Sequence, residues 1–134
     1  MRAMVLHEIG SPLRLESRPQ PDPGPGEVRL RVRACGVCRT DLHVVDGELP
    51  KVCACIVPGH EVIGVVDAVG LGATAFEVGA RVGAGWLASS CGRCRYCRDG
   101  EENLCDAPQF NGWTRDGGYA EAMIAAADFC FPIP

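Results

Sequence analysis

The sequence predicts a mainly β fold of short strands joined by turns. It has 17 glycines and 10 prolines among 134 residues, a content that favours turns and argues against a helical bundle. Residues 27–34 alternate between polar and apolar side chains, as a half-buried strand does, and residues 62–69 form an almost continuous β-branched run. With a hydrophobic content of 47%, the length fits one globular domain over residues 1–134.

The first third of the chain is expected to hold three strands, a loop and a helix. Residues 1–9 and 13–17 predict two short strands around a Gly-Ser-Pro turn. Residues 18–26 contain four prolines, which remove N–H donors and restrict their predecessors, so they predict an extended loop before the alternating strand. Residues 38–46 are the best short-helix candidate, which Gly47 could end.

The remainder is expected to alternate strands with irregular segments. Residues 62–69, 81–86 and 119–125 predict strands, whereas the cysteine-rich stretch 89–108 predicts an irregular lobe. Residues 70–75 match a Gly-x-Gly-x-x-Ala dinucleotide fingerprint, which needs a helix to follow it inside a βαβ unit. The glycines that follow are too frequent for a helix, so we interpret this stretch as a turn between strands.

Composition narrows the possible partners and the location. A net charge of −4 with 13 basic residues argues against binding to nucleic acid. The N-terminus has no apolar segment or cleavage site typical of a signal peptide, and the apolar runs 62–66 and 122–127 are too short to span a membrane. We therefore expect a cytoplasmic protein, in which clustered cysteines are metal ligands or reactive thiols rather than disulfides.

Four cysteines give the strongest signal for a metal site. Their spacing is Cys-x2-Cys-x2-Cys-x7-Cys, which lets successive thiolates turn toward one centre while a longer loop brings the fourth around. Arginines at 93, 95 and 98 can offset the negative charge. We predict a closed, structural zinc site, with an iron–sulfur cluster or two disulfides as alternatives. The four ligands are Cys91, Cys94, Cys97 and Cys105.

A second group of polar residues suggests a reactive centre. Residues 38–43 bring a thiol, a hydroxyl, a carboxylate and an imidazole into one short segment, and His60 follows Gly59 at the start of the next strand. Cys38 and His60 make half of a zinc site, whereas a catalytic zinc needs three protein ligands and an open position. Each alone is more often a packing residue.

The remaining cysteines and His7 give weaker evidence for a functional site. Cys35 and Cys38 also form a Cys-x-x-Cys pair, which favours a redox motif, but the βαβ context of that motif is absent. Cys53, Cys55 and Cys130 have no metal-site spacing, so we expect them to be packing residues. We interpret His7 as structural.

Four motifs together resemble the zinc-dependent alcohol dehydrogenases of the medium-chain dehydrogenase/reductase superfamily. They are Ala34–His43, Pro58–Glu61, Glu102–Cys105 and Asp116–Ala120. The resemblance implies a GroES-like fold, a distorted and partly open barrel with one or two short helices and a zinc-binding lobe at about residues 89–108. It also implies two zinc ions, NAD(P)-linked interconversion of a small alcohol with its aldehyde or ketone, and frequent homo-oligomers.

The resemblance also assigns roles to individual residues. Around the catalytic zinc it makes Cys38 and His60 ligands, Glu61 a carboxylate that can approach the metal, and Asp41 the carboxylate that orients the histidine. It implies a proton path through Thr40 to His43, contacts to the cofactor from Arg39 and His43, and an aromatic pocket wall at Trp86. It identifies the four lobe cysteines as ligands of the structural zinc.

The same resemblance places other parts of the enzyme outside these 134 residues. It implies that the third ligand of the catalytic zinc, usually a cysteine, and the Rossmann domain with its glycine fingerprint follow Pro134. We therefore expect this chain alone to be inactive and to bind NAD(H) poorly. Two alternatives stay open: a non-enzymatic, zinc-stabilised module, and a thiol redox protein that uses Cys35 and Cys38.

Overall fold

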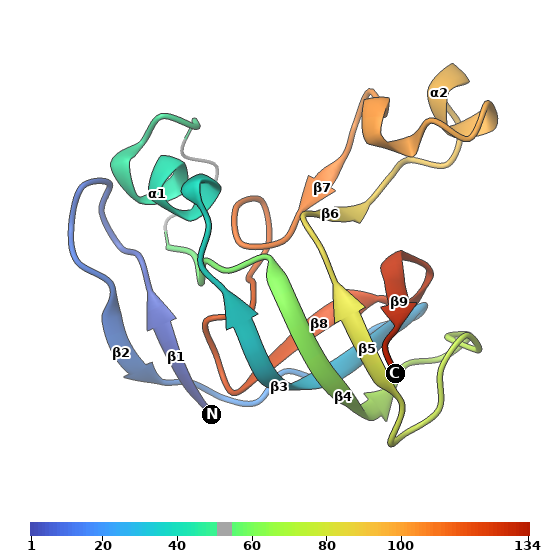
Figure 1. Ribbon diagram of the computed structural model, residues 1–134, viewed down its shortest axis with the longest axis horizontal. Helices are drawn as coiled ribbons and strands as arrows, with labels where there is room; N and C mark the ends of the chain where they lie inside the picture. Colours follow the sequence, from blue (N-terminus) through green and yellow to red (C-terminus); the bar gives the residue numbers. More distant parts are fainter. Residues whose placement is uncertain (51–54) are drawn as a thin grey trace.

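The structure, a computed structural model, describes residues 1–50 and 55–134. Its centre is an antiparallel five-stranded sheet in the order β8-β3-β4-β5-β9, which curves into a partly open barrel because β8 and β9 remain at its two ends (Figure 1). The strands of this sheet are β3 (Glu27–Gly36), β4 (Glu61–Val69), β5 (Arg81–Ala84), β8 (Ala122–Ala126) and β9 (Cys130–Pro132). The prediction of a mainly β fold is confirmed.

Within the described residues, two smaller strand pairs and two helices accompany this sheet. The pairs are β1 (Arg2–Val5) with β2 (Arg14–Ser17), and β6 (Leu87–Ser89) with β7 (Gln109–Phe110). The helices are α1 (Arg39–Asp46) and α2 (Arg95–Arg98), and short 3-10 turns are η1 (Glu102–Leu104) and η2 (Ala127–Phe129). Among the residues that the structure describes, no helix has the length and apolarity to cross a membrane.

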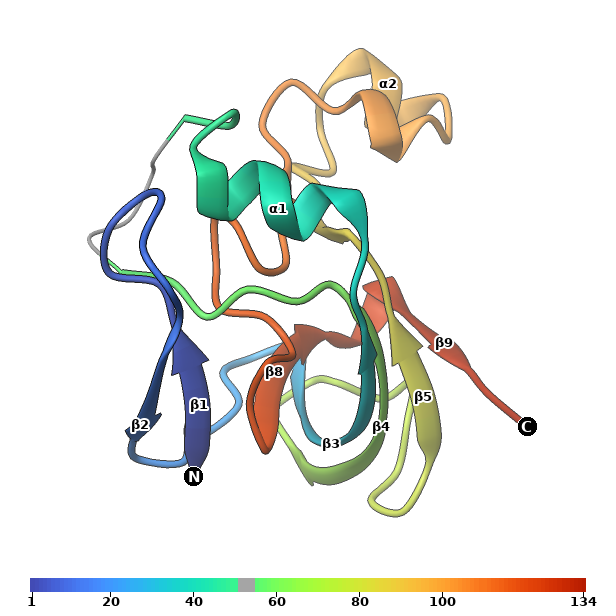
Figure 2. The same cartoon turned by 60° about the vertical axis from the view of Figure 1, so that its left-hand side comes forward.

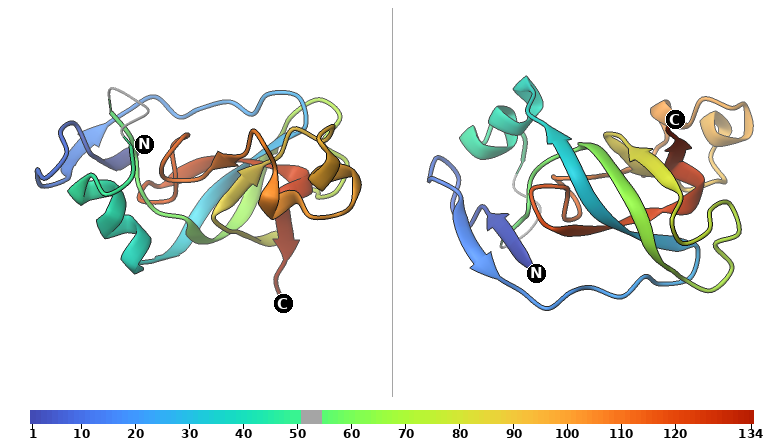
Figure 3. Two further views of the ribbon diagram at one scale, coloured as in Figure 1. Left: turned by 90° about the horizontal axis from the view of Figure 1, so that it is seen from above. Right: turned by 60° about the horizontal axis from the view of Figure 1, so that its bottom comes forward.

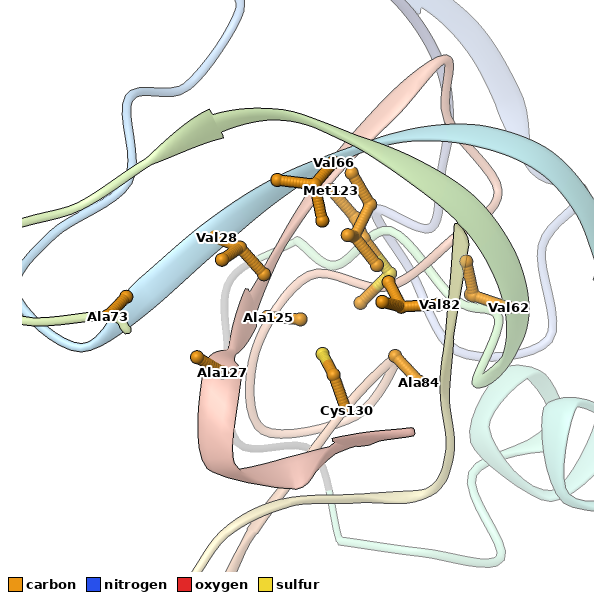
Figure 4. Packing of buried hydrophobic residues seen from close by; sticks show 11 residues of the cluster. Val28, Val62, Val66, Ala73, Val82, Ala84, Met123, Ala125, Ala127 and Cys130 are labelled. Atoms are coloured by element: carbon orange, nitrogen blue, oxygen red, sulfur yellow. The ribbon is translucent and has the colours of Figure 1, made fainter. Parts of the chain in front are cut away.

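The alternating strand is the middle of the barrel, as its pattern predicts. β3 pairs with β4 on one side and with β8 on the other. Val28 and Leu30 are fully buried, whereas Arg31 points outward and is exposed. Figure 4 shows the core between the strands, where valines of β3, β4 and β5 meet Met123 and Cys130. Hydrophobic burial on one face therefore fixes the register of the sheet.

The helix α1 lies above one end of the sheet (Figure 2). Cys38 is its N-cap, so the helix begins one residue later than expected, and Gly47 ends it with a positive φ of 78°. Val44 packs with Leu6 and Ile56 in a small apolar cluster that joins the helix to the first strands. The proline-rich segment 18–26 runs along the outside of the barrel from β2 to β3, as expected of an extended loop (Figure 3).

The structure differs from the sequence-based elements mainly at their ends. The strand expected over residues 81–86 ends earlier, as β5 at Ala84, and a separate strand β6 begins at Leu87. The last residues form β9 against β5. The fingerprint-like residues 70–75 contain no helix, which confirms a turn between strands. Cys130 is buried in the core and Cys55 packs beside a second cluster, as expected of packing residues, while Cys53 lies outside the described residues.

The cysteine-rich lobe projects from the barrel on the β6–β7 pair, at the upper right of Figure 1. It is less irregular than expected, because α2 begins after Cys94 and makes one helical turn that also carries Cys97. Neither α2 nor η1 contains a buried residue. The lobe therefore has little apolar packing to hold it.

Candidate metal centres

The lobe brings its four cysteines to one point. The sulfur atoms of Cys91, Cys94, Cys97 and Cys105 all lie within 4.8 Å of one another. The sulfur of Cys97 is 3.9 Å from that of Cys91 and 3.5 Å from that of Cys94. A tetrahedral zinc with bonds of about 2.3 Å needs sulfurs about 3.8 Å apart, so this donor set fits one such ion. The described cysteines are free, which argues against the disulfide alternative.

Backbone groups around the lobe favour thiolates. Hydrogen bonds from the N–H groups of Arg93 and Cys94 lower the pKa of Cys91 to about 6. The Ser90 hydroxyl acts in the same direction on Cys97, but desolvation and the neighbouring thiols outweigh it and raise the pKa of Cys97 to about 11. Like charges so close together cannot all form without a cation, whereas a divalent ion would compensate them.

A second donor group lies where α1 meets β4. Cys38 Sγ is 3.1 Å from His60 Nε2, and Asp41 completes a set whose ligand atoms lie within 4.8 Å of one another. His60 is 5% exposed and Asp41 is 3% exposed. Zinc bonded to sulfur and nitrogen needs them about 3.5 Å apart, so the thiol and the imidazole would have to separate by a few tenths of an ångström.

The Asp41 carboxylate orients both His60 and Cys38. Its Oδ1 lies 3.2 Å from His60 Nδ1 and accepts the N–H of Gly59, while its Oδ2 accepts the N–H of Cys38 at 2.9 Å. An imidazole that donates from Nδ1 keeps its Nε2 lone pair for a metal. One carboxylate therefore fixes both the imidazole ring of His60 and the backbone of Cys38.

The start of α1 presents the thiol. Cys38 Sγ accepts the N–H of Thr40 at 3.3 Å, and the Asp41 carboxylate accepts the N–H of Cys38, which together form a capping box. The sequence places a cysteine where serine or threonine is usual. This local geometry aims the sulfur at His60 and leaves the thiol half-buried.

The other residues named from the sequence lie around this group. Thr40 and His43 share one face of α1, and His43 Nδ1 is 2.5 Å from Glu48 Oε2. Arg39 is exposed and its guanidinium lies 3.6 Å from the Glu48 carboxylate. Glu61 is exposed and its carboxylate lies over Gly36, so it is not among the three donors.

A cluster of aromatic rings lies beside His60. The Trp86 ring meets the His60 ring edge-on, with 4.9 Å between centroids. Its own face stacks on Phe110 and on Trp113, the latter at an interplanar angle of 3°. Of these three aromatic residues, only Trp86 was expected from the sequence to lie at the site. The available signal for the other two was a pair of aromatic residues three positions apart in an otherwise polar segment.

The thiol redox alternative gains no support from the geometry. Burial raises the pKa of Cys35 to about 11, which leaves it protonated at neutral pH, while attack on a disulfide needs a thiolate. The described strands of the main sheet pair antiparallel, so no βαβ unit of the redox type surrounds the pair. Cys35 instead packs against the core.

Several known proteins that resemble this chain are alcohol dehydrogenases. The family described as the alcohol dehydrogenase GroES-like domain matches residues 24–134. An alcohol dehydrogenase of Geobacillus stearothermophilus is 47% identical over the whole chain. Among solved structures, an NAD-dependent alcohol dehydrogenase superposes with a TM-score of 0.91 at 40% identity and covers the whole chain. A cobalt- and zinc-bound thermostable alcohol dehydrogenase from Pyrobaculum aerophilum gives 0.91 at 34% identity over 98% of the chain.

These proteins are longer than the present chain. The chain spans 40% of the length of the Geobacillus relative, and 40% and 41% of the two solved structures.

Proposed function

This chain belongs to the alcohol dehydrogenase GroES-like domain family, and we propose that it supplies the metal-binding part of a zinc-dependent, NAD(P)-linked alcohol dehydrogenase. The observation that carries the proposal is the pair formed by Cys38 and His60, with Sγ 3.1 Å from Nε2 and Asp41 on the far ring nitrogen. A buried carboxylate behind a histidine is the usual support of a metal ligand. The proposed domain is residues 1–134, with the zinc-binding lobe at about 89–108.

The two donor groups suit different tasks. Four cysteines fill the coordination sphere of a tetrahedral ion, so the lobe site is proposed to be structural. Cys38 and His60 leave positions open for a further ligand and for substrate. A zinc bound there would act as a Lewis acid toward an alcohol oxygen. Small alcohols and their aldehydes or ketones are the proposed substrates.

Residues of this chain would transfer the proton of the alcohol to solvent. We propose that the Thr40 hydroxyl accepts the proton of the bound alcohol and that His43, one turn later on α1, passes it outward. His43 is about one-third exposed and faces the Glu48 carboxylate, so its ring connects the buried side of the helix to solvent. His60 would not be available for this proton, because Asp41 lies at its Nδ1 and a bound zinc would occupy its Nε2.

The remaining parts of the site are also proposals. Arg39 is exposed at the start of α1, where its guanidinium can meet a cofactor pyrophosphate. Trp86 would form one wall of the substrate pocket beside His60. Glu61 would approach the metal only after a change of rotamer. Binding of NAD(P) and the third zinc ligand are assigned to sequence outside these residues.

We also propose a cytoplasmic location and self-association. The free cysteines of both donor groups need a reducing compartment to keep their thiols. The homo-oligomer is proposed from the family alone.

A fusion tests the proposed activity. Residues 1–134 would be joined to the part of the Geobacillus stearothermophilus alcohol dehydrogenase that this chain does not match, and NAD⁺ reduction with simple alcohols would be followed spectroscopically. We expect turnover in the fusion and its loss in Cys38→Ser, because serine is a poor zinc ligand. Leu42→Ala, on the exposed side of α1, is the matched control and should retain turnover.

Two results would count against the function. A folded, zinc-loaded fusion without turnover would favour the non-enzymatic, zinc-stabilised module. Full activity in the Cys38→Ser fusion would show that the reaction does not use this centre.

A further inference from the structure

We propose that Glu48 is a positioning residue for the proton path. It holds the imidazole of His43 with a proton on Nδ1, and so leaves Nε2 as the nitrogen that accepts a proton. This role rests on the proposed function, which routes the proton of the alcohol through Thr40 to His43. Glu48 lies just beyond the end of α1, outside the four motifs that carry the family resemblance.

The contact joins one ring nitrogen to one carboxylate oxygen. His43 Nδ1 lies 2.5 Å from Glu48 Oε2. An ionised carboxylate only accepts hydrogen bonds, so the ring nitrogen that faces it must be the one that carries a proton. A neutral imidazole has a single N–H, which leaves the lone pair on Nε2. The contact therefore selects the tautomer that can take up a proton at Nε2.

The backbone at the end of α1 places Glu48 beside this ring. Gly47 has a φ of 78°, and this left-handed residue ends the helix. The N–H of Glu48 donates to the carbonyl oxygen of His43 at 2.9 Å. The next residue, Leu49, packs on the apolar cluster that joins α1 to the first strands. The main chain thus brings the carboxylate to His43, so the contact does not depend on two mobile side chains alone.

The second carboxylate oxygen of Glu48 faces Arg39. Arg39 Nη2 lies 3.6 Å from Glu48 Oε1, and the two side chains are 70% and 50% exposed. Such an exposed ion pair adds little to stability. Arg39 and His43 are four residues apart and lie on one face of α1. Both oxygens of Glu48 therefore have a partner on this face, which favours one orientation of the carboxylate.

A carboxylate behind an imidazole serves proton transfer in two ways. It selects the tautomer, and it stabilises the imidazolium that forms when the other nitrogen accepts a proton. In the proposed path the Thr40 hydroxyl gives its own proton to His43 Nε2 as it accepts that of the alcohol. The imidazolium then loses a proton to solvent, which reaches this half-exposed carboxylate. Without Glu48, a solvated neutral histidine favours the proton on Nε2, where it blocks acceptance.

The test is the tautomer of His43 in Glu48→Ala. Long-range ¹⁵N–¹H NMR spectra of the zinc-loaded chain in mildly alkaline buffer distinguish ring nitrogens with and without a proton. We expect the proton of wild-type His43 on Nδ1, and most of it on Nε2 in the variant. His7 is an internal reference that should not change, because its partner Glu16 faces Nε2 and is untouched by the substitution.

Asp46→Ala is the matched control. Asp46 lies in α1 and is exposed, and among the described residues it is not a hydrogen-bond partner of His43. The substitution removes the same charge from the same end of the helix. We expect the His43 tautomer of wild type in this variant. Both variants change an exposed side chain, so the urea midpoint should stay close to that of wild type.

Turnover of the fusion described above gives a second readout. General acid–base transfer contributes about 10²- to 10⁴-fold to a rate. Because part of the variant population keeps the accepting tautomer, we expect Glu48→Ala to lower kcat by less than this, about tenfold. The KM for the alcohol should stay unchanged, because Glu48 lies outside the donor group of Cys38, Asp41 and His60. Asp46→Ala should match wild type in both constants.

The outcomes separate this role from the proposed function. A wild-type fusion without turnover overturns the proposed function and the proton path with it. Turnover in wild type with an unchanged His43 tautomer in Glu48→Ala overturns the role of Glu48 alone. An equal tautomer shift in Asp46→Ala would also reject it, since the charge and not the contact would then select the tautomer. A shifted tautomer with unchanged kcat would show that the path does not depend on it.

Discussion

At the scale of residues, the candidate centre depends on close approach between three chain segments. Gly59 lies between the Tyr119 ring and the Cys35 sulfur, and a Cβ there would be 2.6 Å from the one and 2.8 Å from the other. Its positive φ adds a conformational reason for glycine. Position 59 must therefore lack a side chain if the imidazole of His60 is to reach Cys38.

Gly59→Ala should destabilise the protein by about 3 kcal/mol, because the strain of a positive φ adds to the clash with backbone and ring. Gly10→Ala is the matched control: its φ is +76°, but nothing lies within 4 Å of a Cβ built there, so about 1 kcal/mol is expected. Urea unfolding at equilibrium measures both. Equal losses would show that backbone conformation alone, and not close packing, requires the glycine.

Only part of this residue-level geometry could be predicted from sequence. Cys38 and His60 stood out because both residue types bind zinc and each lies in a short motif with recognisable flanking residues. The contact of Tyr119 with Gly36 and the stack on Trp86 did not, because both join segments distant in sequence. Periodicity and spacing contain no information about such contacts.

At the scale of elements, the lobe and the barrel are stabilised by different means. The barrel strands bury a continuous apolar cluster. The lobe contains α2 and η1 without a buried residue, and its cysteine sulfurs gather within 4.8 Å. Its cysteine spacing was predictable, because the ligands are close in sequence. The single turn of α2 was not, because no helix of four residues is stable by propensity alone.

Removal of zinc should therefore unfold the lobe and leave the barrel folded. Hydrogen–deuterium exchange with and without a chelator measures this by segment. After chelation we expect residues 91–105 to lose protection, while β3 and β4 stay protected because their hydrogen bonds are buried between neighbouring strands. Equal protection of the lobe in both states would show that it needs no metal.

At the scale of the whole molecule, one open sheet supports both donor groups. β4 starts with the residue after His60, and β5 continues into β6, which leads to the lobe. The sequence patterns predicted the mainly β class because alternation and β-branched runs reflect burial on one face. The pairing of β9 with β5 was not predictable, since a three-residue strand is specified only by its partner.

We propose that this chain carries two separate zinc centres, one closed and one open. Native mass spectrometry of the zinc-loaded chain tests this proposal by counting the ions bound per molecule. We expect two zinc ions in wild type, one in Cys38→Ser, and one in the double variant Cys91→Ser/Cys94→Ser. A wild-type chain that is folded with one zinc or none, or a double variant that keeps both ions, would contradict it.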